Sequence, residues 1–507
     1  MPQPGERMPE WLRQRAALSP DRLALILGNE KWTFAELDRH VSASAGRLAA
    51  AGVRAGDRVA LLARSSAEFV QVAHAVPRLG AVIVPLNVRL TPSELVQQVS
   101  GSGAALLAYD EPSAAKAVAV AERLPRLRCP PIVELTARRD EGLSEGAVEG
   151  VDLVHSAAVH SVIYTSGTGG RPKGAMLTFG NHLWSAVGSA LNLGLHNDDR
   201  WLACLPLFHV GGLAILLRSV IYGMPVVLQD GFDPAAVNRA IDDQGVTTVS
   251  VVSNMLQRML EERGRRPYPS SLRCVLVGGG PVPRRLLEEC AGRGLPVVQT
   301  YGLTETASQV ATLAPEDALR RLGSAGKPLL PMELSIEDDD GMAVAAGQPG
   351  EIVVRGPTVT PGYLNCPEET RKALRDGWLH TGDVGYLDDD GYLYVLDRRD
   401  DLIISGGENV YPAEVEGVLQ SHPAVLEAGV TGLPDEGWGQ TVAATVRLRD
   451  GATASEEDLL TFCRGRLASY KAPTRLRIAG GLPRNAAGKL LRRALREEWL
   501  RRPPSAP

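Results

Sequence analysis

The sequence has no long hydrophobic run. No stretch of about 18 uninterrupted apolar residues, the length that can cross a bilayer as a helix, occurs in its 507 residues. The N-terminal segment, MPQPGERMPEWLRQRAALSP, also lacks the apolar centre of a secretory signal. We therefore expect a soluble, cytoplasmic protein that has no membrane partner.

Clustered basic residues and paired cysteines are also missing. The formal net charge is -5, the isoelectric point is about 6.1, and no lysine or arginine cluster with interleaved aromatics occurs. This composition argues against a nucleic-acid partner. The six cysteines stand singly, without metal-ligand spacing, so we expect reduced structural thiols.

Lysine is scarce. Lysine and arginine together number 54, and only seven of these are lysines. Where arginine is the default cation, a lysine inside a glycine-rich motif suggests that a compact, flexible ammonium is needed there. Lys173, Lys327 and Lys489 stand in such motifs, whereas chance placement remains open for the other four.

The pattern of apolar segments predicts an α/β protein of two or three domains. From Arg58, the strand RVALLAR, the helix AEFVQVAHAVPRLG and the strand AVIVPL form a βαβ unit. Apolar strands recur at 248–252, 273–280 and 297–302, which predicts largely parallel sheets covered by helices.

The pattern of predicted helices and strands changes twice towards the C-terminus. After about Gly323, short strands separated by Asp-Gly turns predict a smaller antiparallel or barrel-like unit. From Asp401, a mixture of helices and strands predicts a small α+β domain. We therefore expect an N-terminal domain over 1–399 and a C-terminal domain over 400–507.

A glycine-rich loop follows the apolar strand that ends near Tyr164. Glycines let backbone N–H groups converge on an anion, hydroxyls add donors and a lysine adds positive charge, so this composition suits phosphate. It is not the usual NTPase loop, because Lys173 is followed by Gly174 and not by Ser or Thr. An ordinary surface turn is the alternative. The candidate residues are Thr165, Ser166, Gly167, Thr168, Gly169 and Lys173.

Four later segments place polar residues at the ends of apolar strands, where open α/β sheets bind ligands. Each also has a simpler interpretation as a turn or a charged linker. They are Gly278-Gly279-Gly280-Pro281, Tyr301-Gly302-Leu303-Thr304-Glu305-Thr306, Trp378-Leu379-His380-Thr381-Gly382-Asp383 and Asp397-Arg398-Arg399-Asp400-Asp401.

Together and in this order, the motifs resemble the adenylate-forming superfamily of acyl- and aryl-CoA ligases, luciferases and peptide-synthetase adenylation domains. The resemblance runs from Trp32-Thr33-Phe34 to the segment Pro483 to Leu490. It implies a large N-terminal AMP-binding domain, with two parallel-sheet α/β subdomains and a small β-barrel, and a small mobile α+β C-terminal domain. It also implies ATP, Mg²⁺ and CoA as cofactor and co-substrates, and a homodimer as a family-level expectation.

Within the superfamily, several longer segments are similar to the 2-succinylbenzoate-CoA ligases of menaquinone biosynthesis. They include SALNLGL at 189–195, SVIYGM at 219–224 and DLIISGGENVYPAEVE at 401–416. A ligase for another aryl or medium-chain acid remains an alternative. A nucleotide-binding protein without catalysis is a third, which the joint presence of Lys173, Glu305, Asp383 and Lys489 disfavours.

The resemblance implies a role for each ATP-site residue. The loop from Thr165 to Lys173 would hold the pyrophosphate, and Gly278 to Pro281 with Tyr301 and Gly302 would hold adenine. Thr304 would contact the α-phosphate and Glu305 the magnesium ion. Asp383 and Arg398 would hold the ribose, Asp400 would be the hinge, and Lys489 would contact the reacting carboxylate. The family usually has threonine at the position of Gly169, so ATP affinity could be weaker here.

The acyl and CoA sites are less well marked. The resemblance implies that His209 lines the acyl pocket and the pantetheine tunnel, although a histidine satisfied in the core fits the spacing equally well. The other acyl-pocket candidates are Ser253, Asn254, Gly302 and Ser324, and the CoA candidates are Gly406, Gly407 and Trp438. No single arginine can be nominated from the sequence to pair with the aryl carboxylate.

Overall fold

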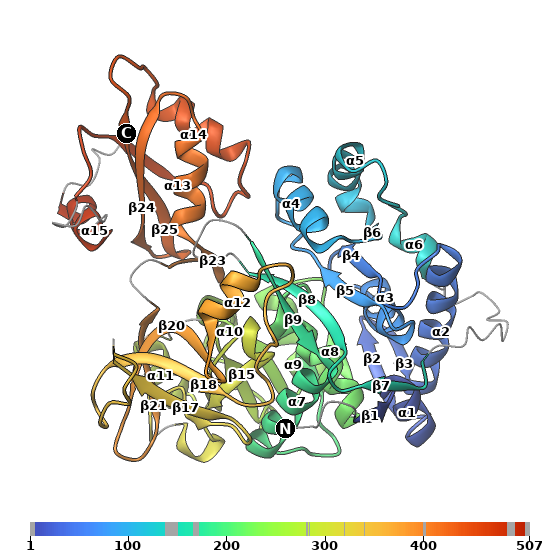
Figure 1. Cartoon of the computed structure of the whole chain (residues 1–507). Coiled ribbons are helices and arrows are strands. Elements are labelled where there is room, and N and C mark those ends of the chain that lie inside the picture. Colours follow the sequence, from blue (N-terminus) through green and yellow to red (C-terminus); the bar gives the residue numbers. More distant parts are fainter. Residues whose placement is uncertain are drawn as a thin grey trace.

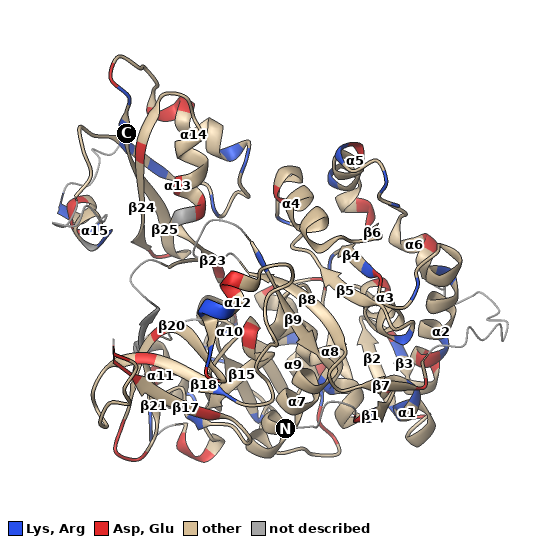
Figure 2. Cartoon of the chain, in the orientation of Figure 1, with Lys and Arg blue, Asp and Glu red and all other residues tan. Residues whose placement is uncertain are grey.

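The computed structural model describes residues 6–501 except 137–150, 166–171, 280, 281, 283, 319, 339, 399–401 and 484–491 (Figure 1). Lysine and arginine are interspersed with aspartate and glutamate along the described elements (Figure 2). Among the described residues, no helix has both the length and the hydropathy needed to cross a membrane.

Two mixed sheets form the centre of the N-terminal part. In the five-stranded sheet the order is β6-β4-β5-β8-β9, and only β9 runs antiparallel to its neighbour. The βαβ unit predicted from Arg58 is confirmed, since α3 (Ala67–Arg78) connects β4 to β5. The strands are β4 (Arg58–Leu62), β5 (Val82–Pro85), β6 (Leu106–Tyr109), β8 (Val159–Thr165) and β9 (Lys173–Thr178).

The second sheet has nine strands in the order β16-β15-β14-β13-β12-β10-β11-β2-β3. Its centre is parallel, as the apolar strands predicted, and its edges β15, β16 and β3 are antiparallel. The strands are β2 (Leu23–Leu27), β3 (Glu30–Thr33), β10 (Trp201–Ala203), β11 (Val226–Leu228), β12 (Thr248–Val251), β13 (Cys274–Val277), β14 (Val297–Leu303), β15 (Ser308–Thr312) and β16 (Lys327–Pro328). The main helices between these strands are α7 (Phe179–Leu193), α8 (Val210–Tyr222), α9 (Pro234–Asp243), α10 (Ser253–Arg263) and α11 (Arg284–Gly292).

The predicted barrel-like unit is an antiparallel sheet of five strands. Its long strand β20 pairs with β18 on one side, and with β19 and β21 at different points along its other side. Because β17 pairs with β18 and with neither β19 nor β21, the pairings among the described residues do not close a barrel. The strands are β17 (Glu333–Glu337), β18 (Gly350–Arg355), β19 (Leu374–Arg375), β20 (Trp378–Leu387) and β21 (Leu393–Arg398).

The C-terminal part is an α+β unit with its own core. Its buried core cluster draws only on residues between Ile403 and Leu476, and Figure 1 shows it as a separate lobe in orange and red. The predicted boundary at 399/400 lies outside the described residues and stays a prediction. The elements are β22 (Ile403–Ser405), β23 (Glu408–Val410), α13 (Pro412–Gln420), β24 (Val425–Asp435), β25 (Gly439–Leu448), α14 (Glu456–Arg464), β26 (Arg475–Ile478) and α15 (Arg492–Arg501).

Capping residues fix where several helices begin. At α2 (Phe34–Ala50), the Thr33 hydroxyl accepts from the Glu36 N–H while the Glu36 carboxylate accepts from the Thr33 N–H. At α4 (Pro92–Ser102), Thr91 and Glu94 form the same reciprocal pair. Such a box satisfies two N–H donors that the helix leaves unpaired.

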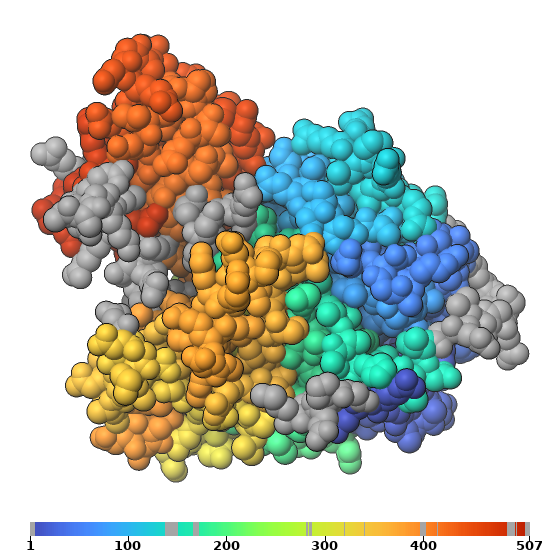
Figure 3. All heavy atoms as spheres, in the orientation of Figure 1, coloured from blue at the N-terminus to red at the C-terminus, as the bar shows by residue number. Residues whose placement is uncertain are grey.

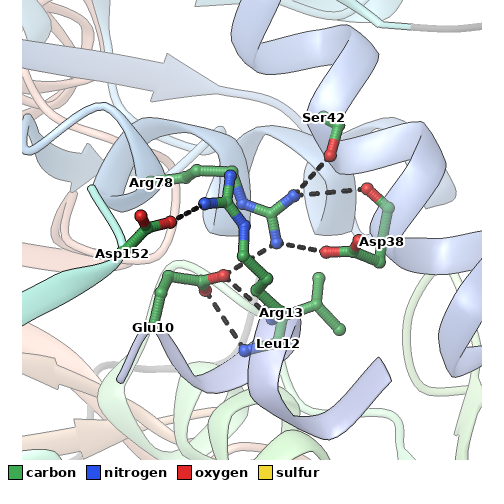
Figure 4. Close-up of polar contacts among 7 residues, drawn as sticks. All are labelled: Glu10, Leu12, Arg13, Asp38, Ser42, Arg78 and Asp152. Carbon is green, nitrogen blue, oxygen red and sulfur yellow. Dashed lines mark hydrogen bonds and ion pairs between the residues drawn. The ribbon is translucent and has the colours of Figure 1, made fainter. Parts of the chain in front are cut away.

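A buried arginine ties together the first helices (Figure 4). Glu10 caps α1 (Trp11–Leu18), and its carboxylate also accepts from Arg78 Nη2 at 2.8 Å. Arg78, at the end of α3 and only 1% exposed, also donates to the Asp38 carboxylate at 2.6 Å and to Ser42 Oγ at 2.8 Å. The arginine therefore links α1, α2 and α3 through compensated charges.

Candidate active site

One cavity of about 840 Å³ brings together segments that are far apart in the sequence. Its lining includes Thr165 at the end of β8, Gly278 after β13, Asp383 on β20 and Gly407 from the C-terminal unit. The ends of the apolar strands thus converge as expected for an open α/β sheet. Both units of the chain contribute to the wall.

Thr165 and Lys173 form the described base of the predicted phosphate loop. They are partners in the antiparallel β8–β9 pair, and both line the cavity. Lys173 Nζ lies 5.2 Å from the centre of the Tyr363 ring, and the Tyr363 hydroxyl donates to Glu305 Oε1 at 2.9 Å. Burial and the Glu305 charge raise the pKa of Tyr363, so the hydroxyl stays protonated and remains a donor. A cation and a carboxylate therefore flank the same part of the cavity.

Glu305 and Thr304 lie on a single 3₁₀ turn (Thr304–Thr306), and both line the cavity. Among the described residues, no group of three or more His, Cys, Asp or Glu side chains could hold a metal ion. Mg²⁺ at nucleotide sites is commonly bound through one or two carboxylates together with substrate phosphates and water. The single carboxylate of Glu305 therefore fits a magnesium ion that arrives with ATP.

Two close backbone approaches shape the nucleotide side of the cavity. A Cβ at Gly278 would lie 2.8 Å from Thr300 Cγ2, and one at Gly302 would lie 1.6 Å from the Ser308 carbonyl oxygen. No larger residue fits at Gly302 without moving β15. Gly279 has a φ of +78°, in the left-handed region that glycine adopts readily.

Asp383 lines the cavity and is held by a neighbouring tyrosine. The Tyr301 hydroxyl donates to Asp383 Oδ2 at 2.7 Å, and Asp383 is only 4% exposed. Tyr301 is itself buried and does not line the cavity, so its predicted stacking on adenine stays a prediction. Arg398 is the strand partner of Asp383 in β21, and its side chain lies outside the described residues.

His209 contacts a residue of the C-terminal unit. It stands at the N-terminus of α8, and its Nε2 lies 3.1 Å from Glu408 Oε2 on β23. Glu408 Oε1 also accepts from Arg89 Nη1 at 3.1 Å. Burial opposes ionisation of Glu408, but His209 and then Arg89 outweigh it and hold the pKa of this carboxyl below its usual value. A charged Glu408 therefore orients the His209 ring at the cavity wall.

A glycine turn between β22 and β23 closes against the N-terminal part. Gly406 and Gly407 both have positive φ angles, of +59° and +81°, and both line the cavity. A Cβ at Gly407 would lie 3.2 Å from Val252 Cγ2, and one at Gly406 would lie 2.4 Å from the Trp438 ring. Trp438 itself is 55% exposed. The two glycines thus allow the C-terminal unit to reach the cavity.

Arg218 was not found by the sequence reasoning. It lies on α8, is 3% exposed and lines the cavity. Its Nη2 donates to Ser185 Oγ at 3.2 Å, its guanidinium lies 5.5 Å from the Trp201 ring centre, and its Nε has no hydrogen-bond partner among the described residues. No described carboxylate forms an ion pair with it. A buried guanidinium without a counter-ion is costly, so this site suits an anion supplied by a ligand.

Two of the predicted acyl-pocket positions lie elsewhere. Ser253 and Asn254 begin α10 and do not line the cavity, and Asn254 Nδ2 donates to the Gly437 carbonyl at 2.7 Å. The neighbouring Val252 and Met255 line it instead. The assignment of the two polar residues to the acyl pocket therefore stays a prediction.

Ser324 is likewise placed in a structural role. It is fully buried, and its hydroxyl donates to the Leu393 carbonyl at 2.9 Å and accepts from the Gly326 N–H at 2.9 Å. The remaining predicted positions lie outside the described residues. They are Ser166, Gly167, Thr168, Gly169, Gly280, Pro281, Asp400 and Lys489.

Residues 12–364 match the AMP-binding enzyme family, and residues 414–489 match the AMP-binding enzyme C-terminal domain. The chain belongs to this family. It is an ATP-dependent, AMP-forming acyl-CoA ligase with the adenylate-forming α/β fold, so the predicted fold class is confirmed. A 2-succinylbenzoate-CoA ligase of Geobacillus kaustophilus (strain HTA426) is 55% identical over 489 residues, which are 96% of this chain and 97% of the relative.

Two crystal structures of o-succinylbenzoate CoA synthetase from Bacillus subtilis are also similar. Each is 47% identical, and each alignment covers 97% of this chain and 98% of the relative. A double mutant bound with its product analogue OSB-NCoA superposes with a TM-score of 0.91. The complex with the acyl-adenylate intermediate OSB-AMP superposes with a TM-score of 0.75.

Proposed function

We propose that this enzyme is a 2-succinylbenzoate-CoA ligase of menaquinone biosynthesis. It activates the succinyl carboxylate of 2-succinylbenzoate with ATP and then transfers the acyl group to CoA, releasing AMP. The observation that carries this choice of acid is Arg218, a buried cation in the cavity whose counter-ion is not supplied by any described residue. The second carboxylate of 2-succinylbenzoate, on its aromatic ring, is such a counter-ion.

Arg218 lines the cavity from α8, and Lys173, Thr304 and Glu305 line it from β9 and the turn after β14. A dianion with one carboxylate at Arg218 would direct its other carboxylate towards the α-phosphate. Holding both reactants in one orientation lowers the entropic part of the barrier. The Arg218 site would then serve both selectivity and alignment.

The first half-reaction is an attack of the succinyl carboxylate on the α-phosphorus with loss of pyrophosphate. Negative charge builds on phosphate oxygens, so fixed donors and cations aimed at them are the main catalytic resource. The cations would be Lys173 and, by the family resemblance, Lys489, and the neutral donor would be the Thr304 hydroxyl. A magnesium ion held by Glu305 and the phosphates would neutralise further negative charge. The Asp383 carboxylate would orient the ribose by accepting hydrogen bonds from the ribose hydroxyls.

The second half-reaction is an attack of the CoA thiol on the acyl carbonyl, which expels AMP. The thiol must lose its proton. His209 Nε2 lies 3.1 Å from the charged Glu408 carboxylate and therefore donates to it, which leaves Nδ1 of the neutral imidazole as the nitrogen that would accept the thiol proton. Gly406 and Gly407 would leave room for the pantetheine chain beside it. Trp438, more than half exposed, would offer an aromatic face to the CoA adenine outside the cavity.

A ligase for another aryl or medium-chain acid is the second candidate. Mass spectrometry of reactions with ATP, magnesium, CoA and one acid at a time tests the two. We expect succinylbenzoyl-CoA from 2-succinylbenzoate at a rate well above the products of benzoate, octanoate and 4-oxo-4-phenylbutanoate. A faster reaction with any of these monoanions would refute the proposal. A cytoplasmic location and a homodimeric state also belong to the proposal, and cell fractionation and light scattering test them.

A further inference from the structure

A buried lysine joins the C-terminal unit to the N-terminal part. Lys471, 4% exposed, donates from its Nζ to Glu94 Oε1 at 2.9 Å and to Glu414 Oε1 at 2.7 Å. Glu414 belongs to α13 of the same unit, whereas Glu94 belongs to α4 of the N-terminal part. One ammonium thus bridges the two units, and Figure 3 shows the C-terminal unit against the surface that contains α4.

Neighbouring contacts continue this interface. The Thr91 hydroxyl donates to the Arg466 carbonyl at 3.1 Å, and Asn87 Nδ2 donates to the Tyr470 hydroxyl at 3.3 Å. The segments 87–94 and 466–471 therefore meet along their length. The pair of Lys471 and Glu94 is a buried contact between opposite charges in this strip, and Arg89 of the same segment forms a second ion pair across the units, with Glu408.

Within the C-terminal unit, Glu414 already supplies a carboxylate to Lys471, so this unit does not need Glu94 to neutralise its lysine. With Glu94 added, two carboxylates share one ammonium. Burial raises the pKa of Glu414, Lys471 opposes that rise and Glu94 adds to it. Burial disfavours the charged form of Lys471, yet the two carboxylates together raise its pKa, so it stays an ammonium. Both carboxylates contact the same ammonium, so a separation of the two units would leave the buried Glu94 without its cationic partner.

The same arrangement of the two units forms the contact between Glu408 and His209. It also places Gly407 beside Val252. The two solved structures of the Bacillus subtilis relative superpose unequally on this chain, with TM-scores of 0.91 for the complex with OSB-NCoA and 0.75 for the complex with OSB-AMP, at equal identity and coverage. Taken over the whole chain, the arrangement is therefore more similar to that of the complex with the product analogue.

We propose that Glu94 and Lys471 form a latch, a positioning pair that holds the C-terminal unit in the arrangement used for thiol transfer. The latch rests on the proposed function, since it assigns the two half-reactions to two arrangements of the units. Glu94 does not line the cavity, whereas Lys471 is part of its wall. They act by keeping Glu408 at His209 and the glycine turn at the cavity, and a turn of the C-terminal unit for adenylation would separate them.

Glu94→Gln tests the latch with little change of shape. Glutamine is as good as glutamate in a capping box, so α4 keeps its start, while the charged partner of Lys471 is lost. Glu36→Gln is the matched control, because Glu36 has the same position in the capping box of α2. Tyr470→Phe is a second, uncharged perturbation, which removes the hydroxyl that accepts from Asn87. Both residues also line the cavity, so the ratio of the two rates, and not the transfer rate alone, reports on the latch in this variant.

Two rates are measured for each variant. Pyrophosphate exchange with 2-succinylbenzoate and no CoA reports adenylation, and a rapid-quench single turnover from preformed acyl-adenylate and CoA reports transfer. We expect Glu94→Gln to slow transfer by about tenfold, the effect of losing one hydrogen bond to a charged group, and to change exchange by less than about twofold. Tyr470→Phe slows transfer by about twofold to threefold, the smaller effect of a neutral hydrogen bond. Glu36→Gln changes neither rate.

Equal losses in the two rates of Glu94→Gln, or no loss in transfer, would overturn the latch. A melting temperature for Glu94→Gln that matches that of Glu36→Gln excludes a general loss of structure, and if Glu94→Gln does not fold, the ratio of the two rates of Tyr470→Phe decides. The proposed function fails separately. It fails if the wild-type protein forms no succinylbenzoyl-CoA, whereas the latch fails if the wild type forms it and the variants follow the wrong pattern.

Discussion

Replacing Arg218 by methionine removes the cation at the wall of the cavity and keeps most of its apolar volume. A hydrogen bond to a charged group contributes roughly 1.5–3 kcal/mol, and a bidentate guanidinium–carboxylate contact is at the upper end. Loss of the contact therefore lowers kcat/KM for 2-succinylbenzoate by about 10-fold to 150-fold.

The comparison substrate is 4-oxo-4-phenylbutanoate, which keeps the succinyl carboxylate and lacks the carboxylate on the ring. Its kcat/KM should change little in Arg218→Met, or rise, because the variant no longer leaves a buried cation unpaired. The assay is AMP release under steady-state conditions with saturating ATP and CoA. Equal losses for both acids would refute the pairing of Arg218 with the ring carboxylate.

A second buried arginine supplies the control. Arg263, 4% exposed, donates to the Asp242 carboxylate at 2.7 Å and does not line the cavity. Arg263→Met should lower the melting temperature, because it leaves Asp242 without its cation, and should keep the preference for 2-succinylbenzoate. Arg218→Met should keep or raise the melting temperature, since the cation it removes has no described carboxylate partner. A variant that loses the preference for 2-succinylbenzoate but not the melting temperature shows that Arg218 acts in substrate recognition, whereas the reverse result for Arg263 shows a role in folding.

Three further outcomes are expected. Lys489→Ala should lower adenylation by about 100-fold to 1000-fold and spare transfer from supplied acyl-adenylate, with equal losses in both contradicting its role. In urea unfolding, Arg78→Leu should cost about 3–5 kcal/mol because it leaves the buried Glu10 and the partly buried Asp38 without their cation, whereas Arg13→Leu, which loses only its exposed pair with Asp152, should cost less than about 1 kcal/mol. Burial lowers the pKa of His74 to about 4 and of His182 to about 3, so both stay neutral in the folded state while the unfolded chain binds protons below about pH 6.5. The free energy of unfolding is therefore highest near pH 7.5 and falls as the pH falls, by about 1.4 kcal/mol for each of these histidines at pH 5.5. In His74→Gln, the decrease between pH 7.5 and pH 5.5 should be smaller by the contribution of one histidine, as urea unfolding at the two pH values would measure.

Features that depend on neighbours in the chain could be predicted from the sequence. The parallel sheets follow from apolar strands with helices between them, and Gly278, Glu305 and Asp383 were found because polar residues and glycines at strand ends mark a ligand site. The same rule gave Ser253 and Asn254, which begin α10 and are not among the residues that line the cavity. The rule gives the edge of a sheet and not the direction of each side chain.

Contacts between distant segments could not be predicted. Nothing near Glu408 in the sequence indicates that it meets His209, and nothing near Glu94 indicates Lys471. Arg218 did leave a signal, because α8 reads VGGLAILLRSVIY, an apolar helix with one charge. A helix that is apolar on all sides is buried, so its one arginine had to be buried as well and needed an anion.

The central claim is that one cavity holds the acyl-adenylate of 2-succinylbenzoate between Arg218 and the nucleotide side. A crystal structure of the enzyme with a non-hydrolysable sulfamoyl analogue of that adenylate tests it most directly. We predict the ring carboxylate within hydrogen-bonding distance of the Arg218 guanidinium, the ribose hydroxyls at Asp383 and the sulfamoyl group beside Thr304. A ring carboxylate that points to solvent, or that pairs with another residue while Arg218 stays unpaired, would contradict it.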